Sequence, residues 1–224
     1  MSCRWARAAA AAAGLWVAAA AAGAEPFAAL EAASTAPGYL ARLLINETPF
    51  PGERGYVSEE DTKAAMLSIL WVLHSRLNHI PEGYSQEQIA AIRTRNVIEL
   101  ITAENQCAGF HRGADGQPAA DARVEERIGN LLGIANGGGT PGRFARLLTF
   151  GQGLASAYLK GGIPGADRFA GLERVERVAV TGRAYSWMTG RDCYHPGGNF
   201  IGIPDGDQGL LGGNRFFTLR KDPR

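Results

Sequence analysis

The segment from Ser58 to Leu77 constrains the fold most, because it predicts a helix that is apolar on every side. Ser58 is a typical N-cap residue, and the three acids after it suit the positive end of a helix dipole. At about 100° per residue, the apolar side chains surround the helix axis: Ala64, Ala65, Met66, Leu67, Ile69, Leu70, Trp71, Val72 and Leu73. We therefore expect this helix to lie inside a domain, covered by other elements.

A shorter apolar segment precedes this helix and ends in a glutamate. Leu40, Leu43 and Leu44 follow helical spacing, and Pro49 predicts that the helix ends before it. Glu47 then stands at or just past a helix C-terminus, where the dipole disfavours an anion. Burial acts in the same direction, so we expect the pKa of Glu47 to lie above its ordinary value.

The rest of the chain predicts more helices and a few late strands. Helices are expected over three stretches: Gln86 to about Glu104, with residues 93–96 as a candidate interruption, Arg123 to Ile134, and Thr140 to Gly161. Residues 106–117 read as a loop. Short β-like runs occupy residues 174–185, 199–203 and 214–219. These patterns favour a mainly α (α+β) fold, with a helical core around the buried helix and a small C-terminal β element.

The first 24 residues have the features of a secretory signal peptide. Arg4 and Arg7 precede an apolar run from Ala8 to Ala21, and residues 22–24 form an A-x-A cleavage site, with a cut expected after Ala24. An uncleaved anchor is the alternative. Residues 25–37 then read as a lead-in, residues 38–219 as a single domain and residues 220–224 as a tail. We expect an exported protein, periplasmic or secreted, without stable membrane insertion after cleavage.

Charge and histidine spacing argue against two classes of function. Loss of the signal segment leaves 21 of the 23 basic residues against 22 acids, which is not the basic footprint of a nucleic-acid binder. The four histidines are scattered and form no H-x-x-x-H motif: His74, His79, His111 and His195. We expect no metal and no cofactor.

Two cysteines, Cys107 and Cys193, remain after the signal segment. An even pair in an exported chain predicts one disulfide, which would close a loop of about 86 residues and contribute on the order of 4 kcal/mol. Two unpaired buried thiols are the alternative. A third reading is a thiol enzyme in which Cys107 works with His111 or His195.

The acids are the remaining candidates for chemistry, because no G-x-S-x-G or complete G-x-G-x-x-G motif is present. Glycoside cleavage needs a carboxylic acid that can protonate the leaving oxygen, and Glu47 would serve if its pKa is raised. Glu53 fits either a second carboxylate or a structural partner for Arg54 or Arg76. A solvated surface glutamate is the alternative reading of Glu47.

Several motifs occur in the order found in one family of enzymes. They are Ile45-Asn46-Glu47, Pro51-Gly52-Glu53, the helix end at residues 70–77, the loop at residues 106–110, the helix at residues 146–161 and the run at residues 214–217. This order resembles the spore cortex-lytic, cell-wall hydrolase family. The resemblance implies a lysozyme-like, mostly helical fold and cleavage of peptidoglycan glycan strands. It also implies that Glu47 is the single acid/base of a lytic transglycosylase.

The chain departs from the family pattern at three places. Glu47 and Glu53 are six residues apart, where the family spacing is shorter. Ser75 stands in place of an asparagine, and Cys107 in place of a phenylalanine, with Phe110 three residues later. These departures fit either a divergent enzyme or a domain that kept the fold and lost the activity. The second reading gives the alternative function, a non-catalytic exported domain that binds peptidoglycan or a protein partner.

Aromatic and amide side chains in irregular segments are candidates for a sugar-binding groove. Aromatic faces give sugar rings an apolar platform, and polar groups bind the hydroxyls. The predicted substrate-binding residues are Glu53, Gln106, Phe110, Tyr185, Trp187 and Tyr194. Ordinary packing is the alternative for each aromatic residue.

Overall fold

Helix α2 (Glu59–Asn78) runs through the middle of the molecule in the computed structural model, which describes residues 26–189, 196–204 and 210–222. The Ser58 hydroxyl accepts a hydrogen bond from the Asp61 amide, as expected of an N-cap. Met66, Ile69, Leu70 and Leu73 are fully buried. The prediction of a buried central helix is confirmed, and Trp71 is one of its few apolar residues that stay partly exposed.

Three helices pack together on one side of α2. Helix α1 (Ala36–Asn46) lies against α6 (Arg143–Leu159), and α5 (Ala122–Asn136) packs on both. Two short helices, α3 (Gln86–Ala90) and α4 (Val97–Thr102), follow α2 in the chain. No helix in the described ranges is long and apolar enough to cross a membrane.

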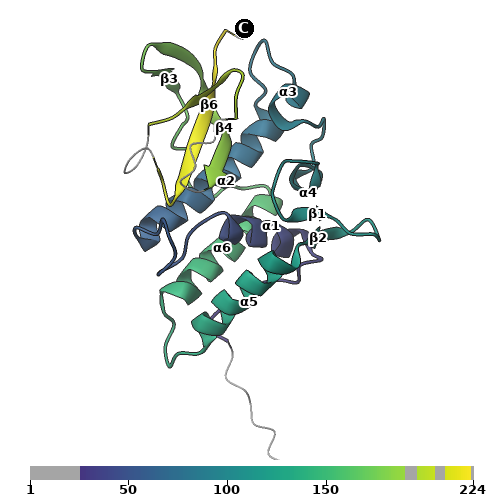
Figure 1. Ribbon diagram of the computed structural model, residues 1–224, viewed down its shortest axis with the longest axis vertical. Coiled ribbons are helices and arrows are strands. Elements are labelled where there is room, and N and C mark those ends of the chain that lie inside the picture. The colour runs from purple at the N-terminus through teal and green to yellow at the C-terminus, as the bar shows by residue number, and fades with distance from the viewer. Residues whose placement is uncertain (1–25, 190–195, 205–209, 223–224) are drawn as a thin grey trace, which may run out of the picture.

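An antiparallel sheet of four strands packs on α2 through its long strand β4 (Val178–Thr189). Its order is β3-β4-β6-β5, with β3 (Leu172–Val175), β5 (Phe200–Gly202) and β6 (Asn214–Arg220). Figure 1 shows α2 between this sheet and the group formed by α1, α5 and α6. A second sheet pairs β1 (Phe110–Arg112) with β2 (Pro118–Ala120).

The expected mainly α fold with a lysozyme-like core and only a small β element is wrong. The described residues form an α+β fold of six helices and two antiparallel sheets, and no lysozyme-like core is present in them. The sheet was underestimated because β4 is irregular. Its pairing shifts register between Val180 and Ala184 and again between Ala184 and Ser186, which breaks the period-2 pattern that announces a strand.

The predicted helix from Gln86 to Glu104 is divided in the structure, and the Gln86 side chain explains the division. Its amide donates to the Arg76 and Thr94 carbonyls and accepts from the Thr94 amide. Ala91 ends α3 with a φ of 54°, and Asn96 caps the start of α4. The side chain thus holds residues 91–95 as a turn. The predicted loop at residues 106–117 contains β1, which is also a difference from the sequence expectation.

Two glycines in α6 predict opposite responses to alanine. A Cβ at Gly151 would lie 3.0 Å from Ile45 Cγ1, whereas a Cβ at Gly153 would meet no atom within 4 Å. Gly153→Ala should raise the free energy of unfolding by about 0.5–1 kcal/mol, the usual helix-propensity gain. The free energy of unfolding of Gly151→Ala should be about 1–3 kcal/mol lower than that of Gly153→Ala, because Ile45 is fully buried and an added methyl group would overpack the α1–α6 contact. Urea denaturation of both variants tests this, and equal gains would contradict the close approach.

Candidate functional site

Glu47 occupies the C-cap of α1, as predicted. Its amide donates to the Leu43 carbonyl at 3.0 Å, and the chain then turns toward Pro49. The Thr48 hydroxyl donates to the Leu44 carbonyl and satisfies part of the helix end. The Glu47 residue is only 8 % exposed, so the turn carries its carboxyl group into the protein rather than into bulk water.

Three neutral donors reach the buried carboxyl group. The Trp187 indole Nε1 donates to Oε2 at 3.0 Å, the Asn46 amide donates to Oε1 at 3.4 Å, and the Thr189 side chain also forms a hydrogen bond. Within the described part of the chain Glu47 forms no ion pair. Burial raises the pKa of Glu47 above its ordinary value, and this effect outweighs the donors and the more distant positive charge of Arg127. The group is therefore held toward its protonated form.

The irregularity in β4 brings two of these donors to Glu47. Ala184 pairs with Thr218 and Ser186 with Phe217, so β4 carries an extra residue at this point and its later side chains are redirected. Trp187 is buried, whereas Thr189 is exposed at the end of the strand. The carboxyl group therefore has one buried and one exposed hydrogen-bond partner from the same strand.

Strand β6 is tied directly to the end of α1. Asn214, at the first position of β6, donates from its amide to the Glu47 carbonyl at 2.8 Å and to the Gly212 carbonyl at 3.0 Å. Asn214 is fully buried, and its side-chain oxygen has no hydrogen-bond partner among the described residues. The Glu47 N–H is therefore held by α1 and the Glu47 carbonyl by β6, two elements far apart in the sequence.

Arg76 of α2 is a site residue that sequence reasoning did not identify as one. It is buried, donates from Nε to the Tyr185 carbonyl at 2.6 Å, and donates from Nη1 to the Gln106 side chain at 3.0 Å. Its guanidinium carbon lies 5.3 Å from the centroid of the Trp187 ring. Burial lowers the pKa of Arg76 to about 10, so the group remains a cation at neutral pH. A single arginine at a helix end gives no sequence signal for this arrangement.

Glu53 is bound to an arginine that the sequence did not suggest. Arg127 of α5 pairs with Glu53 at 2.6 Å, where the sequence suggested Arg54 or Arg76. Arg127 also donates to the Ile45 and Thr48 carbonyls, and Glu53 accepts from the Phe50 amide. This network clamps the turn that carries Glu47. Of the two readings of Glu53, the structure favours the structural one.

The other predicted groove residues fall into two groups, those that reach the Glu47 cluster and those that pack elsewhere. Trp187 contacts Glu47, and Gln106 reaches the same cluster through Arg76. Phe110 is buried and packs edge-on against Tyr39, while Tyr185 is 2 % exposed and its hydroxyl donates to the His79 carbonyl. These two positions fit ordinary packing rather than a sugar platform. Tyr194 lies outside the described residues.

Cys107 lies beside this cluster as a buried free thiol. Burial, followed by the charge of Glu47, raises the pKa of Cys107 to about 12, which disfavours the thiolate that a thiol enzyme needs. His111 faces Asp121 at 3.3 Å, and His195 lies outside the described residues. Cys193 lies outside them as well, and because Cys107 is a free thiol, the predicted disulfide through Cys107 is not formed in this structure.

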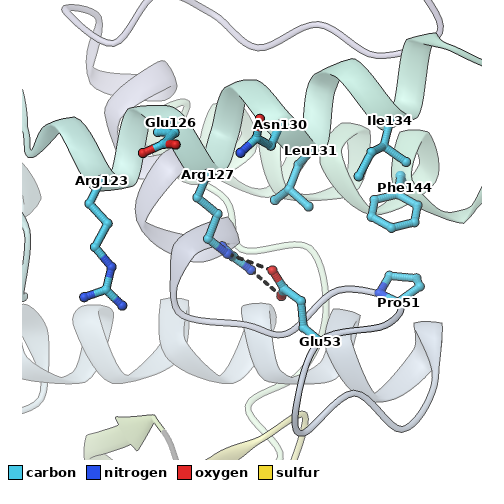
Figure 2. Close-up of a pocket in the computed structure, with 9 residues that line it drawn as sticks. All are labelled: Pro51, Glu53, Arg123, Glu126, Arg127, Asn130, Leu131, Ile134 and Phe144. Carbon is cyan, nitrogen blue, oxygen red and sulfur yellow. Dashed lines mark hydrogen bonds and ion pairs between the residues drawn. The ribbon is translucent and has the colours of Figure 1, made fainter.

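A shallow groove of about 330 Å³ lies on the α5 side of the molecule (Figure 2). The Glu53–Arg127 pair projects into it, with Phe144, Leu131, Ile134 and Pro51 toward one end and Arg123 and Glu126 toward the other. Glu47 is not among its lining residues. Within the part of the chain that the structure covers, no three His, Cys, Asp or Glu side chains are grouped so as to hold a metal ion.

The buried carboxyl group predicts a pH-dependent stability. Because the pKa of Glu47 is raised in the folded state, its stabilising contribution is fully present below the ordinary value of 4.5 and is lost as the pH rises through the folded-state pKa. Glu47→Gln does not titrate, so in this window wild type should lose about 1.4 kcal/mol per pH unit relative to the variant. Urea denaturation of both proteins across pH measures the difference, with Glu173→Gln on β3 as an exposed control. A constant difference across pH would contradict a raised pKa.

Comparisons of the chain with protein-family models, with curated proteins and with solved structures found no match in any of the three.

Proposed function

We propose that the protein cleaves the glycan strands of peptidoglycan, with Glu47 as a single general acid and base. The observation that supports this most is the state of the Glu47 carboxyl group, which is buried, unpaired with any described cation and held toward its protonated form beside the exposed Thr189. A proton donor for a glycosidic oxygen needs these properties. The predicted export signal and the order of the sequence motifs suggest the substrate class.

The chemistry requires one carboxyl group in two steps. In the first step Glu47 gives its proton to the glycosidic oxygen, and the bond from that oxygen to C1 of the sugar breaks. In the second step the resulting carboxylate takes the proton of the same sugar's C6 hydroxyl, whose oxygen bonds to C1. The products are a 1,6-anhydro sugar and a free hydroxyl on the other strand, and Glu47 is protonated again.

The environment of Glu53 favours this route over a two-carboxylate mechanism. Two-carboxylate glycosidases place a second free acid about 5–9.5 Å from the first. Glu53 is instead engaged by Arg127 and by the Phe50 amide, and it faces the groove on the α5 side. We therefore expect intramolecular transfer to the C6 hydroxyl rather than hydrolysis.

The test is mass spectrometry of the soluble products after incubation of the purified protein with peptidoglycan sacculi. Anhydro-muropeptides that appear only with the protein are the expected result. Muropeptides with reducing ends would show that the protein cleaves the strand by hydrolysis and not by intramolecular transfer. An absence of both kinds of product would contradict the proposal.

A non-catalytic exported binding domain is the second candidate function. Its support is that Gln106 and Glu53, two predicted substrate-binding residues, are both engaged in internal contacts. Glu47 is also not among the residues that line the groove on the α5 side. This candidate predicts that the protein sediments with sacculi and releases no muropeptides.

A further inference from the structure

Arg76 is a buried cation whose hydrogen-bond partners within the described ranges are neutral. Its residue is 6 % exposed, and it donates to a backbone carbonyl and to the Gln106 amide oxygen. Burying a charge without a carboxylate partner is unfavourable, and a neutral donor could satisfy the same two oxygens. The positive charge therefore calls for another explanation.

The geometry connects that charge to Glu47 through one ring. The Arg76 guanidinium lies 5.3 Å from the centroid of the Trp187 ring, and the Nε1–H of the same ring donates to Glu47 Oε2 at 3.0 Å. A cation at an indole face is attracted to the ring and draws electron density from it. The N–H then becomes a better donor, and a hydrogen bond to an ionised carboxylate is stronger than one to the neutral acid. Helix α2, strand β4 and helix α1 supply one member each.

We propose that Arg76 is a positioning residue for Glu47, which holds the Trp187 indole with its N–H directed at the carboxyl group and helps that group to release its proton. The coupling itself does not depend on the proposed function. Its biological purpose rests on that function, since a general acid must pass through its carboxylate form in each cycle. Burial opposes that form, and the Arg76–Trp187 pair counteracts burial.

Two other titratable groups face Glu47 from neighbouring elements. Arg127 of α5 lowers the pKa of Glu47, although it is the last of the contributing groups and is itself paired with Glu53. The Cys107 thiol follows α4 in the chain, and its pKa of about 12 keeps it neutral at ordinary pH. The Arg127 guanidinium lies over the Phe50 ring, whereas the Arg76 guanidinium lies over the Trp187 ring, so we attribute an effect transmitted through the indole to Arg76.

The first test uses the unmodified protein. The Trp187 indole N–H resonance, followed by NMR across pH, should titrate with the same midpoint as the Glu47 carboxyl carbon. Trp71 is a matched control, because its indole also lies near an arginine, Arg183, but its N–H donates to the Gly165 carbonyl. A Trp187 signal that does not follow Glu47, or a Trp71 signal that follows it equally, would overturn the proposal.

The second test is a double-mutant cycle on the Glu47 titration. Arg76→Gln should lower the ionisation constant of Glu47 about tenfold, and Trp187→Phe should act in the same direction. If the effect passes through the indole, Arg76→Gln should have little further effect in the Trp187→Phe background. The proposal would be refuted if Arg76→Gln had its full effect in the Trp187→Phe background, or no effect in the wild-type background. If Arg76→Gln does not fold, the wild-type titration still overturns the proposal when the Trp187 N–H does not follow Glu47. Neither test requires cleavage, so coupled titration without muropeptide release would reject the proposed function alone.

Discussion

Glu47→Gln is expected to reduce the release of muropeptides at least about 10²-fold, the lower end of what a positioned general acid contributes. Glutamine has nearly the same shape and can still accept the Trp187 hydrogen bond, but it has no proton to give to the glycosidic oxygen. The initial rate of product release from sacculi, measured by mass spectrometry, gives the effect.

The control for this variant is the same substitution at an exposed position. Glu173→Gln on the edge strand β3 should retain full activity. The Glu47→Gln protein should remain folded, and above the ordinary glutamate pKa it should gain stability relative to wild type with rising pH. Full activity in folded Glu47→Gln would show that another group supplies the proton.

Leu70→Ala is expected to lower the free energy of unfolding by about 2–5 kcal/mol. Leu70 is fully buried near the middle of α2, where the helix lies between α6 and β4. Removal of the side chain leaves a cavity between α2 and its neighbours. The helix cannot close this cavity by moving toward α6 without losing contact with β4, or the reverse. Urea denaturation measures the loss.

Ile134→Ala on α5 is the matched control for this prediction. Ile134 is also an aliphatic residue on a helix, but it is 57 % exposed, so its truncation should change stability by less than about 0.5 kcal/mol. Equal losses in the two variants would mean that α2 is not the packing centre of the protein.

The difference between these residues shows how far sequence patterns reach. Apolar spacing placed α2 in the core, because a helix that is apolar all round can be covered only from several sides. The sequence also predicted a helix from Arg123 to Ile134, without showing that the Ile134 side chain would stay exposed. The candidate interruption at residues 93–96 of the predicted helix is confirmed, and the break extends over residues 91–96 because the Gln86 side chain competes for backbone groups there.

The position of Glu47 could be predicted because its causes are local. Leucine spacing defined α1, and Pro49 required its end, so a glutamate at the C-cap followed from a few neighbouring residues. The roles of Glu53 and Gln106 could not be predicted in this way. Their partners, Arg127 and Arg76, are 74 and 30 residues away in the sequence.

The sequence by itself determined the central helix and the glutamate at the end of α1, since short-range spacing, capping and proline sterics decide both. Only the tertiary structure decided that a four-stranded sheet covers α2 and that Trp187 and Arg76 meet at Glu47. Those features depend on pairing between β4 and β6, and an extra residue in β4 redirects the side chains that follow it. A register of that kind is set by long-range contacts, which no local pattern in the chain records.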